Sequence, residues 1–285
     1  MPREAILYLS HTVNNAQWRD YARLRRECAG FADVHYISNL NTDVVPPEFT
    51  KTFPITPTKR AALGHPSRTG HTGWWMDTGP THTRDIQSGF DQAILVFRSM
   101  RPEYDYYWLV EHDVDFSGAW SNIIRAFADN RSDLLCSSLH RFETNPTWCW
   151  WNSIKWPDGA KPELVRGFFP IARLSGRAID VIVSAGRDGI DGFYELVWPT
   201  VLHHKGLIIE DFGGDGEFVQ STNKNRWYTS TLTSQNLYPG TLVVRPIRFR
   251  PGREPNKLWH PVKPRFFHHV LTRLTARASL SWWMK

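Results

Sequence analysis

The 285-residue sequence is poor in cysteine and has no long apolar run. The three cysteines are odd in number and form no CxxC pair, which argues against a disulfide framework and a cysteine-rich zinc site. No window approaches the ~18 apolar residues of a membrane span. Residues 1–12 lack the apolar stretch and small-residue cleavage site of a signal peptide. These absences predict a protein of the reducing, cytoplasmic side.

Several motifs that would announce a reaction are also missing. There is no P-loop, no H-E-x-x-H and no G-x-S-x-G. The segment "GGDGEF", residues 213–218, lacks the third glycine of a dinucleotide fingerprint, so we interpret it as a turn. An EF-hand loop beginning at Glu111 is excluded, because Phe116 and Asn122 stand where glycine and glutamate are needed.

The periodicity of the chain alternates between strand and helix. Buried strands are predicted for 5–12, 32–40, 132–139, 167–175 and 207–214, and for the run that begins at Tyr106. Helices are predicted for 16–31, 84–100, 118–130, 176–186 and 194–206. This alternation predicts an α/β fold with a mixed, mostly parallel sheet flanked by helices. We expect a single catalytic domain over residues 1–250, followed by a C-terminal segment over 251–285.

Three carboxylates follow the most strand-like segment, "YYWLVEHDVDF". Glu111, Asp113 and Asp115 stand at alternate positions, and alternate residues of a strand point to the same side. The carboxyl ends of strands are where open α/β sheets bind ligands. Converging carboxylates repel one another unless a cation intervenes, and their oxygens suit Mg²⁺ or Mn²⁺. The pattern therefore predicts a divalent-metal site, and a solvated turn is its structural alternative.

The aromatic and basic residues suggest which surfaces contact the donor, sugars or a membrane. Tryptophan is frequent, with 14 residues, and is favoured where sugar faces or a membrane interface are contacted, although many of these rings are expected in the core. Residues 41–83 lack periodicity and carry Trp74 and Trp75, so we predict a long loop that closes over bound donor. The pattern of residues 265–285 predicts a basic amphipathic helix that either associates with the cytoplasmic face of an anionic membrane or packs on the catalytic domain.

The run "YYWLVEHDVDFSGAW" resembles the Asp-x-Asp region of GT-A-type glycosyltransferases. "GFYELVWPTVLHHKGLIIEDFGG" is similar to the acceptor-side helix and strand of that fold, and "LWHPVKP" to its C-terminal element. Together the three segments extend the resemblance over roughly residues 5–265. The resemblance implies a GT-A-like, Rossmann-like fold and transfer of a sugar from a nucleotide-sugar donor to a glycan, lipid or other hydroxyl acceptor, dependent on Mn²⁺ or Mg²⁺.

The resemblance also implies roles for the matching residues. Asp113 and Asp115 match the Asp-x-Asp pair, with Asp115 as the direct metal ligand and Asp113 nearer the ribose or the metal-bound water. Glu111 is extra to the motif and is expected to orient its neighbours on the donor side. His260 matches the histidine that completes the metal site, and Lys263 is expected to meet a donor phosphate as a point charge.

Two carboxylates compete for the role of base. Glu195 matches the acid that deprotonates the acceptor hydroxyl in inverting members, and Asp211 in "EDFGG" is its rival. A metal-dependent phosphoesterase or nuclease stays as an alternative, because its two-metal sites also use acids at strand ends. A non-enzymatic nucleic-acid-binding protein rests only on the net charge of +6, without a compact basic run, so no nucleic-acid partner is predicted.

Overall fold

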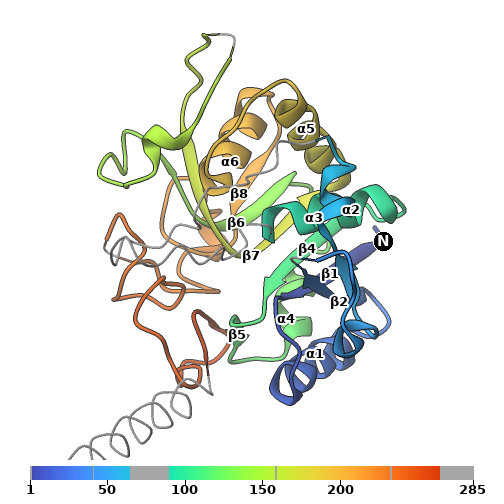
Figure 1. Cartoon of the computed structure of the whole chain (residues 1–285). Helices are drawn as coiled ribbons and strands as arrows, with labels where there is room; N and C mark the ends of the chain where they lie inside the picture. Colours follow the sequence, from blue (N-terminus) through green and yellow to red (C-terminus); the bar gives the residue numbers. More distant parts are fainter. Residues whose placement is uncertain (1, 41, 65–89, 158, 232, 264–285) are drawn as a thin grey trace, which may run out of the picture.

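The computed structural model describes residues 2–40, 42–64, 90–157, 159–231 and 233–263. Its centre is a seven-stranded sheet in the order β3-β2-β1-β4-β7-β6-β8 (Figure 1). The strands are β1 (Glu4–Ser10), β2 (Asp33–Asn39), β3 (Phe53–Ile55), β4 (Tyr106–Glu111), β6 (Leu134–Arg141), β7 (Val165–Ser175) and β8 (Ile209–Asp211). Only β7 runs antiparallel to its neighbours among these strands. The predicted mixed, mostly parallel α/β sheet is confirmed.

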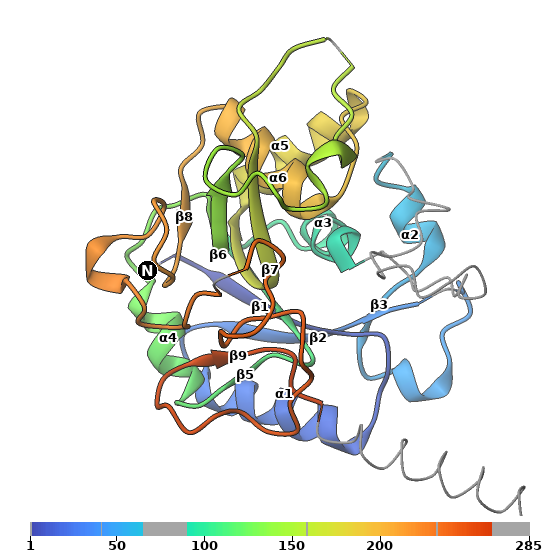
Figure 2. The same cartoon turned by 90° about the vertical axis from the view of Figure 1, so that its left-hand side faces the viewer.

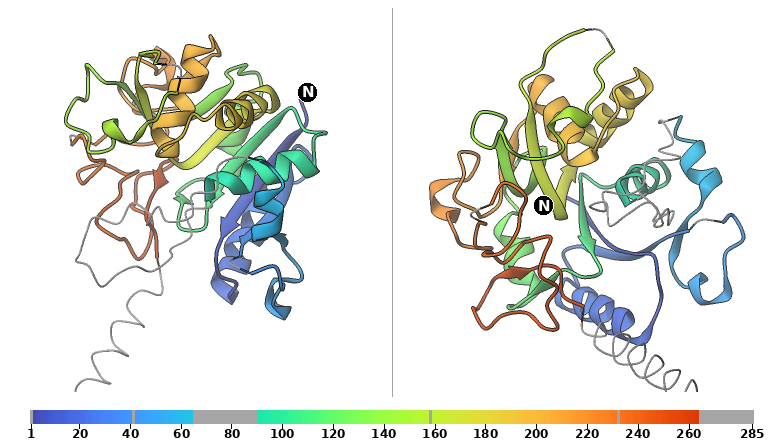
Figure 3. Two further views of the ribbon diagram at one scale, coloured as in Figure 1. Left: turned by 45° about the horizontal axis from the view of Figure 1, so that its top comes forward. Right: turned by 60° about the vertical axis from the view of Figure 1, so that its left-hand side comes forward.

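Helices cover both faces of this sheet, as two further directions of view also show (Figures 1 and 3). One face carries α3 (Phe90–Met100), α5 (Gly176–Arg187) and α6 (Tyr194–His204), and the other carries α1 (Asn15–Glu27) and α4 (Trp120–Ala126). Strand β1 explains the two layers. Its side chains alternate between the two buried clusters, with Leu7 in the first and Ile6 in the second. A strand buried on both faces reads as the continuous apolar run of the sequence.

The segment after residue 212 completes the second face mainly with loops. A two-stranded sheet joins β5 (Asp115–Phe116) to β9 (Leu258–Trp259), so the C-terminal segment lies beside the chain that follows β4 (Figure 2). Backbone hydrogen bonds continue this contact, from Ser117 N to Lys257 O at 2.9 Å and from Val262 N to Asp113 O at 2.7 Å. Residues far apart in the sequence are thereby held at the end of β4.

The structure differs from the prediction for the start of the long loop. Residues 42–64 include a 3-10 turn (Pro47–Phe49), the edge strand β3 and the short helix α2 (Pro57–Ala61). Three-residue strands and five-residue helices are too short for a periodic pattern to show, which explains why a loop was predicted. The rest of that segment, with Trp74 and Trp75, lies outside the described residues, as does the predicted amphipathic helix over 265–285.

No helix in the described ranges is both long enough and apolar enough to cross a membrane.

Candidate functional site

The end of β4 sets the geometry of the site. The strand stops at Glu111, and Val114 N donates to Glu111 O at 3.0 Å, which turns the chain before β5 begins at Asp115. The sequence had suggested that the three acids lie along one continuous strand, and this prediction is wrong. The turn brings Glu111 and Asp113 to one point and carries Asp115 away from it.

Glu111, Asp113 and His260 form one group of metal-binding side chains. Each offers an atom within 4.8 Å of the others. His260 Nε2 lies 3.5 Å from Asp113 Oδ1 and 3.8 Å from Glu111 Oε2, while Lys263 Nζ approaches Asp113 Oδ2 at 3.1 Å. Within the described part of the chain, the buried Asp113 Oδ1 has no hydrogen-bond partner. The structure thus brings together four of the predicted site residues.

The orientation of His260 suits a metal ligand. Its Nδ1 lies 2.8 Å from Val243 O, and because a carbonyl oxygen only accepts, Nδ1 is the donor. Nε2 therefore faces the two carboxylates with its lone pair in the neutral ring. Metal-binding histidines in proteins use the same arrangement, in which a backbone carbonyl fixes the tautomer. The ring of Phe168 on β7 contacts the imidazole edge-on, with centroids 5.5 Å apart.

The charges of this group are strongly coupled. Burial raises the pKa of Glu111 to about 7, and repulsion from Asp113 adds to the effect. Burial also acts to raise the pKa of Asp113, but the attraction of His260 outweighs it and holds that pKa below its usual range. The pKa of His260 is raised, because attraction to Asp113 overcomes burial. A bound divalent cation would supply positive charge to these carboxylates and would displace protons from the group.

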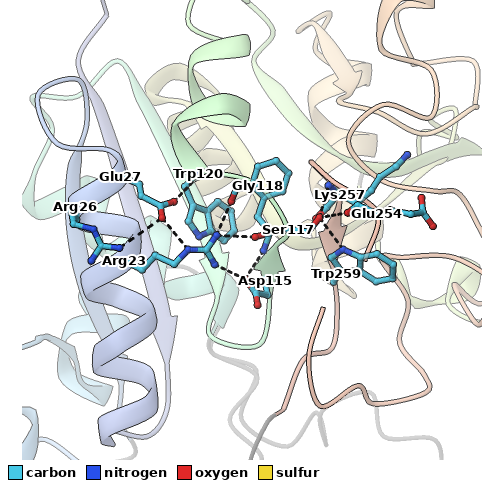
Figure 4. A network of polar contacts seen from close by, with 11 residues as sticks. Arg23, Arg26, Glu27, Asp115, Ser117, Gly118, Trp120, Glu254, Lys257 and Trp259 are labelled. Carbon is cyan, nitrogen blue, oxygen red and sulfur yellow. Dashed lines mark hydrogen bonds and ion pairs between the residues drawn. The ribbon is translucent and has the colours of Figure 1, made fainter. Parts of the chain in front are cut away.

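Asp115 belongs to a different set of contacts (Figure 4). Its Oδ1 pairs with Arg23 Nη1 at 2.8 Å and accepts from Phe116 N at 2.7 Å. Arg23 Nη2 also donates to the carbonyl oxygens of Phe116 and Gly118. Glu27 bonds both Arg23 and the backbone N–H of Trp120, so this network ties α1 to β5 and to the start of α4. The structure does not bring Asp115 into the group around Asp113.

Glu195 lies in the first turn of α6, beside an irregular part of the pairing between β6 and β7. The ladder between β6 and β7 shifts register between Ser137 and His140, and Ser138 has a φ of 52°. Phe169 N on β7 donates to Glu195 Oε1 at 3.1 Å instead of to a strand. Burial raises the pKa of Glu195 to about 8, while Arg166 and His260 act to lower it. Glu195 is therefore a nearly buried carboxyl within electrostatic range of the metal-binding group.

Asp211, the rival of Glu195, has both oxygens occupied. Oδ1 accepts from Gly213 N at 2.9 Å and Gly214 N at 3.1 Å. Oδ2 accepts from Tyr228 Oη at 2.7 Å and Leu139 N at 3.2 Å. Four donors on one buried carboxylate stabilise the loop after β8 against the bulged strand β6.

We expect Asp211→Asn to destabilise the protein and to leave metal binding unchanged. The amide nitrogen of asparagine cannot accept from Leu139 N, and one unpaired buried N–H costs about 1–3 kcal/mol. Denaturant unfolding measures this loss, and calorimetry with Mn²⁺ provides the comparison. Wild-type stability combined with lost sugar transfer would instead identify Asp211 as the base.

No protein-family model matches the chain, and no curated protein matches its sequence. Among solved structures, it is similar to a glycosyltransferase involved in the glycosylation of the major capsid of PBCV-1, with 11% identity and a TM-score of 0.32. That similarity covers 65% of this chain and 66% of the chain of the glycosyltransferase, so it spans less than two thirds of the length of that protein. A second similar structure is described as a glucose-1-phosphate thymidylyltransferase from Bacillus anthracis, with 10% identity, a TM-score of 0.37, and 74% and 87% coverage. The fold class is assigned from the order and direction of the strands in the sheet and not from these similarities.

Proposed function

We propose that this protein is a divalent-metal-dependent glycosyltransferase that moves a sugar from a nucleotide-sugar donor to a hydroxyl acceptor. The observation that carries the proposal is the group formed by Glu111, Asp113 and His260 at the carboxyl end of β4. Two carboxylates and an imidazole with a fixed tautomer are a suitable ligand set for Mn²⁺ or Mg²⁺. Asp113 Oδ1, buried without a hydrogen bond among the described residues, supports the fit.

The ligands are held by three separate parts of the fold. β4 presents Glu111, the following turn presents Asp113, and the backbone contacts of the C-terminal segment bring His260 to them. A bound divalent ion would neutralise charge on the diphosphate of the donor. Lys263, which is 40% exposed, stands beside Asp113 and supplies a second positive charge facing solvent. In this proposal residues 251–263 complete the site of the catalytic domain.

Glu195 is the proposed base for the acceptor hydroxyl. Its buried carboxyl has a pKa raised to about 8, close to the pH at which a general base works best. Only Oε1 has a hydrogen bond from the described residues, so Glu195 keeps the second oxygen for a substrate proton. We propose a glycan or lipid-linked acceptor, with membrane association through residues 265–285 as a separate proposal.

A thermal-shift experiment tests the proposal directly. UDP, GDP, CDP and dTDP are each added with and without Mn²⁺, followed by the corresponding nucleotide sugars. One nucleotide with Mn²⁺, present at about 100 times its Kd, should add about 2.7 kcal/mol of stability and raise Tm by about 5 °C. Stabilisation by two Mn²⁺ ions per chain, with hydrolysis of phosphate esters and no response to nucleotide sugars, would favour the phosphoesterase instead.

A further inference from the structure

Arg166 is a buried cation that the proposed reaction does not yet use. It lies near the start of β7, opposite His140 of β6, and is 1% exposed. Alternate residues of a strand share a face, so Arg166 lies on the same face as Phe168, whose ring contacts His260. Arg166 is therefore on the metal-binding side of the sheet, displaced along β7.

One edge of its guanidinium has no partner among the residues that the structure describes. The flat face lies over Trp148, with 5.1 Å from Cζ to the ring centroid. In the part of the chain that the structure describes, Nε and Nη2 have no hydrogen-bond partner. These two nitrogens form the edge from which arginine donates two parallel N–H groups to a carboxylate or phosphate. Trp148 covers the face of the guanidinium, and the Nε and Nη2 edge is buried without a partner among the described residues.

The other buried arginine of β7 shows the contrast. Arg173 Nη1 donates to Phe127 O at 2.8 Å, and Arg173 Nη2 donates to Asn130 Oδ1 at 2.6 Å. Both terminal nitrogens of Arg173 are therefore hydrogen-bonded within the protein. In the described part of the chain Nε is unpartnered in both arginines, and only Arg166 also lacks a partner at Nη2. A buried charge with unpaired donors is costly, and proteins rarely keep one without a partner.

Glu195 does not supply that partner. It is the first charged group to influence Arg166, yet its hydrogen bond in the described structure is to Phe169 N and not to the guanidinium. Cys149, which is exposed, also lies within electrostatic range of the buried guanidinium.

We propose that the Nε and Nη2 edge of Arg166 binds an oxyanion of the acceptor, a carboxylate or a phosphate, next to Glu195. That the oxyanion belongs to an acceptor rests on the proposed function, whereas binding of the oxyanion itself does not. An acceptor held in this way has its charged group on Arg166 and a hydroxyl beside Glu195, which defines it as an acidic sugar or a sugar phosphate.

Calorimetric titration of the full chain at pH 7 tests the site. The probes are glucuronate and glucose 6-phosphate, with glucose as the neutral match, and EDTA keeps divalent metals away from Glu111 and Asp113. At least one charged probe should bind about tenfold or more tightly than glucose, and the stronger of the two identifies the oxyanion. Arg166→Met should remove this preference. Arg166→Lys, which keeps a charge but not the paired edge, should lower it by about tenfold.

Arg226→Met is the matched control, because the exposed Arg226 also stacks on a tryptophan, at 4.7 Å from the Trp227 ring centroid. This variant should bind the probes like wild type. Equal binding of glucose and the charged probes by wild type would overturn the proposal even if Arg166→Met fails to fold. Unchanged probe binding in Arg166→Lys, with only a shifted pH profile of transfer, would overturn it in favour of a role in setting the pKa of Glu195. Probe binding without any nucleotide-dependent stabilisation would keep the site and refute the glycosyltransferase.

Discussion

Asp113→Asn should lower the affinity for Mn²⁺ by about 100-fold or more and reduce sugar transfer by about 10²–10³-fold. The substitution keeps the shape of the side chain and removes a negative charge that faces His260 Nε2 at 3.5 Å and Lys263 Nζ at 3.1 Å. Calorimetry with Mn²⁺ measures the affinity, and the Mn²⁺-dependent rise in Tm provides a second reading. The metal-free variant should still unfold cooperatively, because the core clusters do not include Asp113.

Asp115→Asn is the matched comparison for this experiment. We expect an Mn²⁺ affinity within about threefold of wild type, because Asp115 Oδ1 is bonded by Arg23 and Phe116 N rather than facing the metal-binding group. The comparison also tests the assignment that the sequence suggested. If Asp115→Asn loses metal as strongly as Asp113→Asn, Asp115 is a ligand. Wild-type Mn²⁺ affinity in Asp113→Asn would refute the proposed metal site.

Glu195→Gln should reduce the rate of transfer by about 10²–10⁴-fold while Mn²⁺ and nucleotide still bind. Glutamine keeps the oxygen that accepts from Phe169 N but cannot take a proton from the acceptor. Steady-state kinetics should therefore show a loss in kcat with little change in the KM for the donor. Transfer at the wild-type rate would exclude Glu195 as the base and leave Asp211 as the candidate base.

The same variant should change how stability depends on pH. Burial raises the pKa of Glu195 from 4.5 to about 8 in the folded protein. Below about pH 4.5 both states hold the proton, and as pH rises toward 8 only the unfolded state releases it, so wild type loses stability over this interval. The loss is at most about 4 kcal/mol, and Glu195→Gln should not show it. Denaturant unfolding at pH 5, 6.5 and 8 measures the difference, and parallel curves for the two proteins would contradict it.

Much of the fold follows from local patterns. The apolar runs that became β1 and β4 are buried on both sides of a sheet, which leaves their sequences almost continuously apolar. The amphipathic repeat of α5 likewise appears without tertiary information. Short elements such as β3 and β5 were missed or merged, because two or three residues carry no period.

The metal-binding group was only partly visible in the sequence. Asp113 and His260 were predicted as metal ligands, His260 through the resemblance, whereas Glu111 was predicted only to orient its neighbours on the donor side. Arg166 was missed, although a single charge inside the apolar run "LVRGFFP" was a signal that it needs a partner.

The sequence by itself determined the order of the longer strands and helices, the acids at the end of β4 and the chemistry that such acids favour. The tertiary structure alone decided which acids meet. The turn after Glu111 aims Asp113 at His260, and Arg23 on α1 takes the carboxylate of Asp115. The tautomer of His260 depends on the carbonyl oxygen of Val243, an atom that every residue has. Contacts between distant segments, and contacts made through the backbone, leave no mark in the local sequence, because they depend on where the folded chain places them.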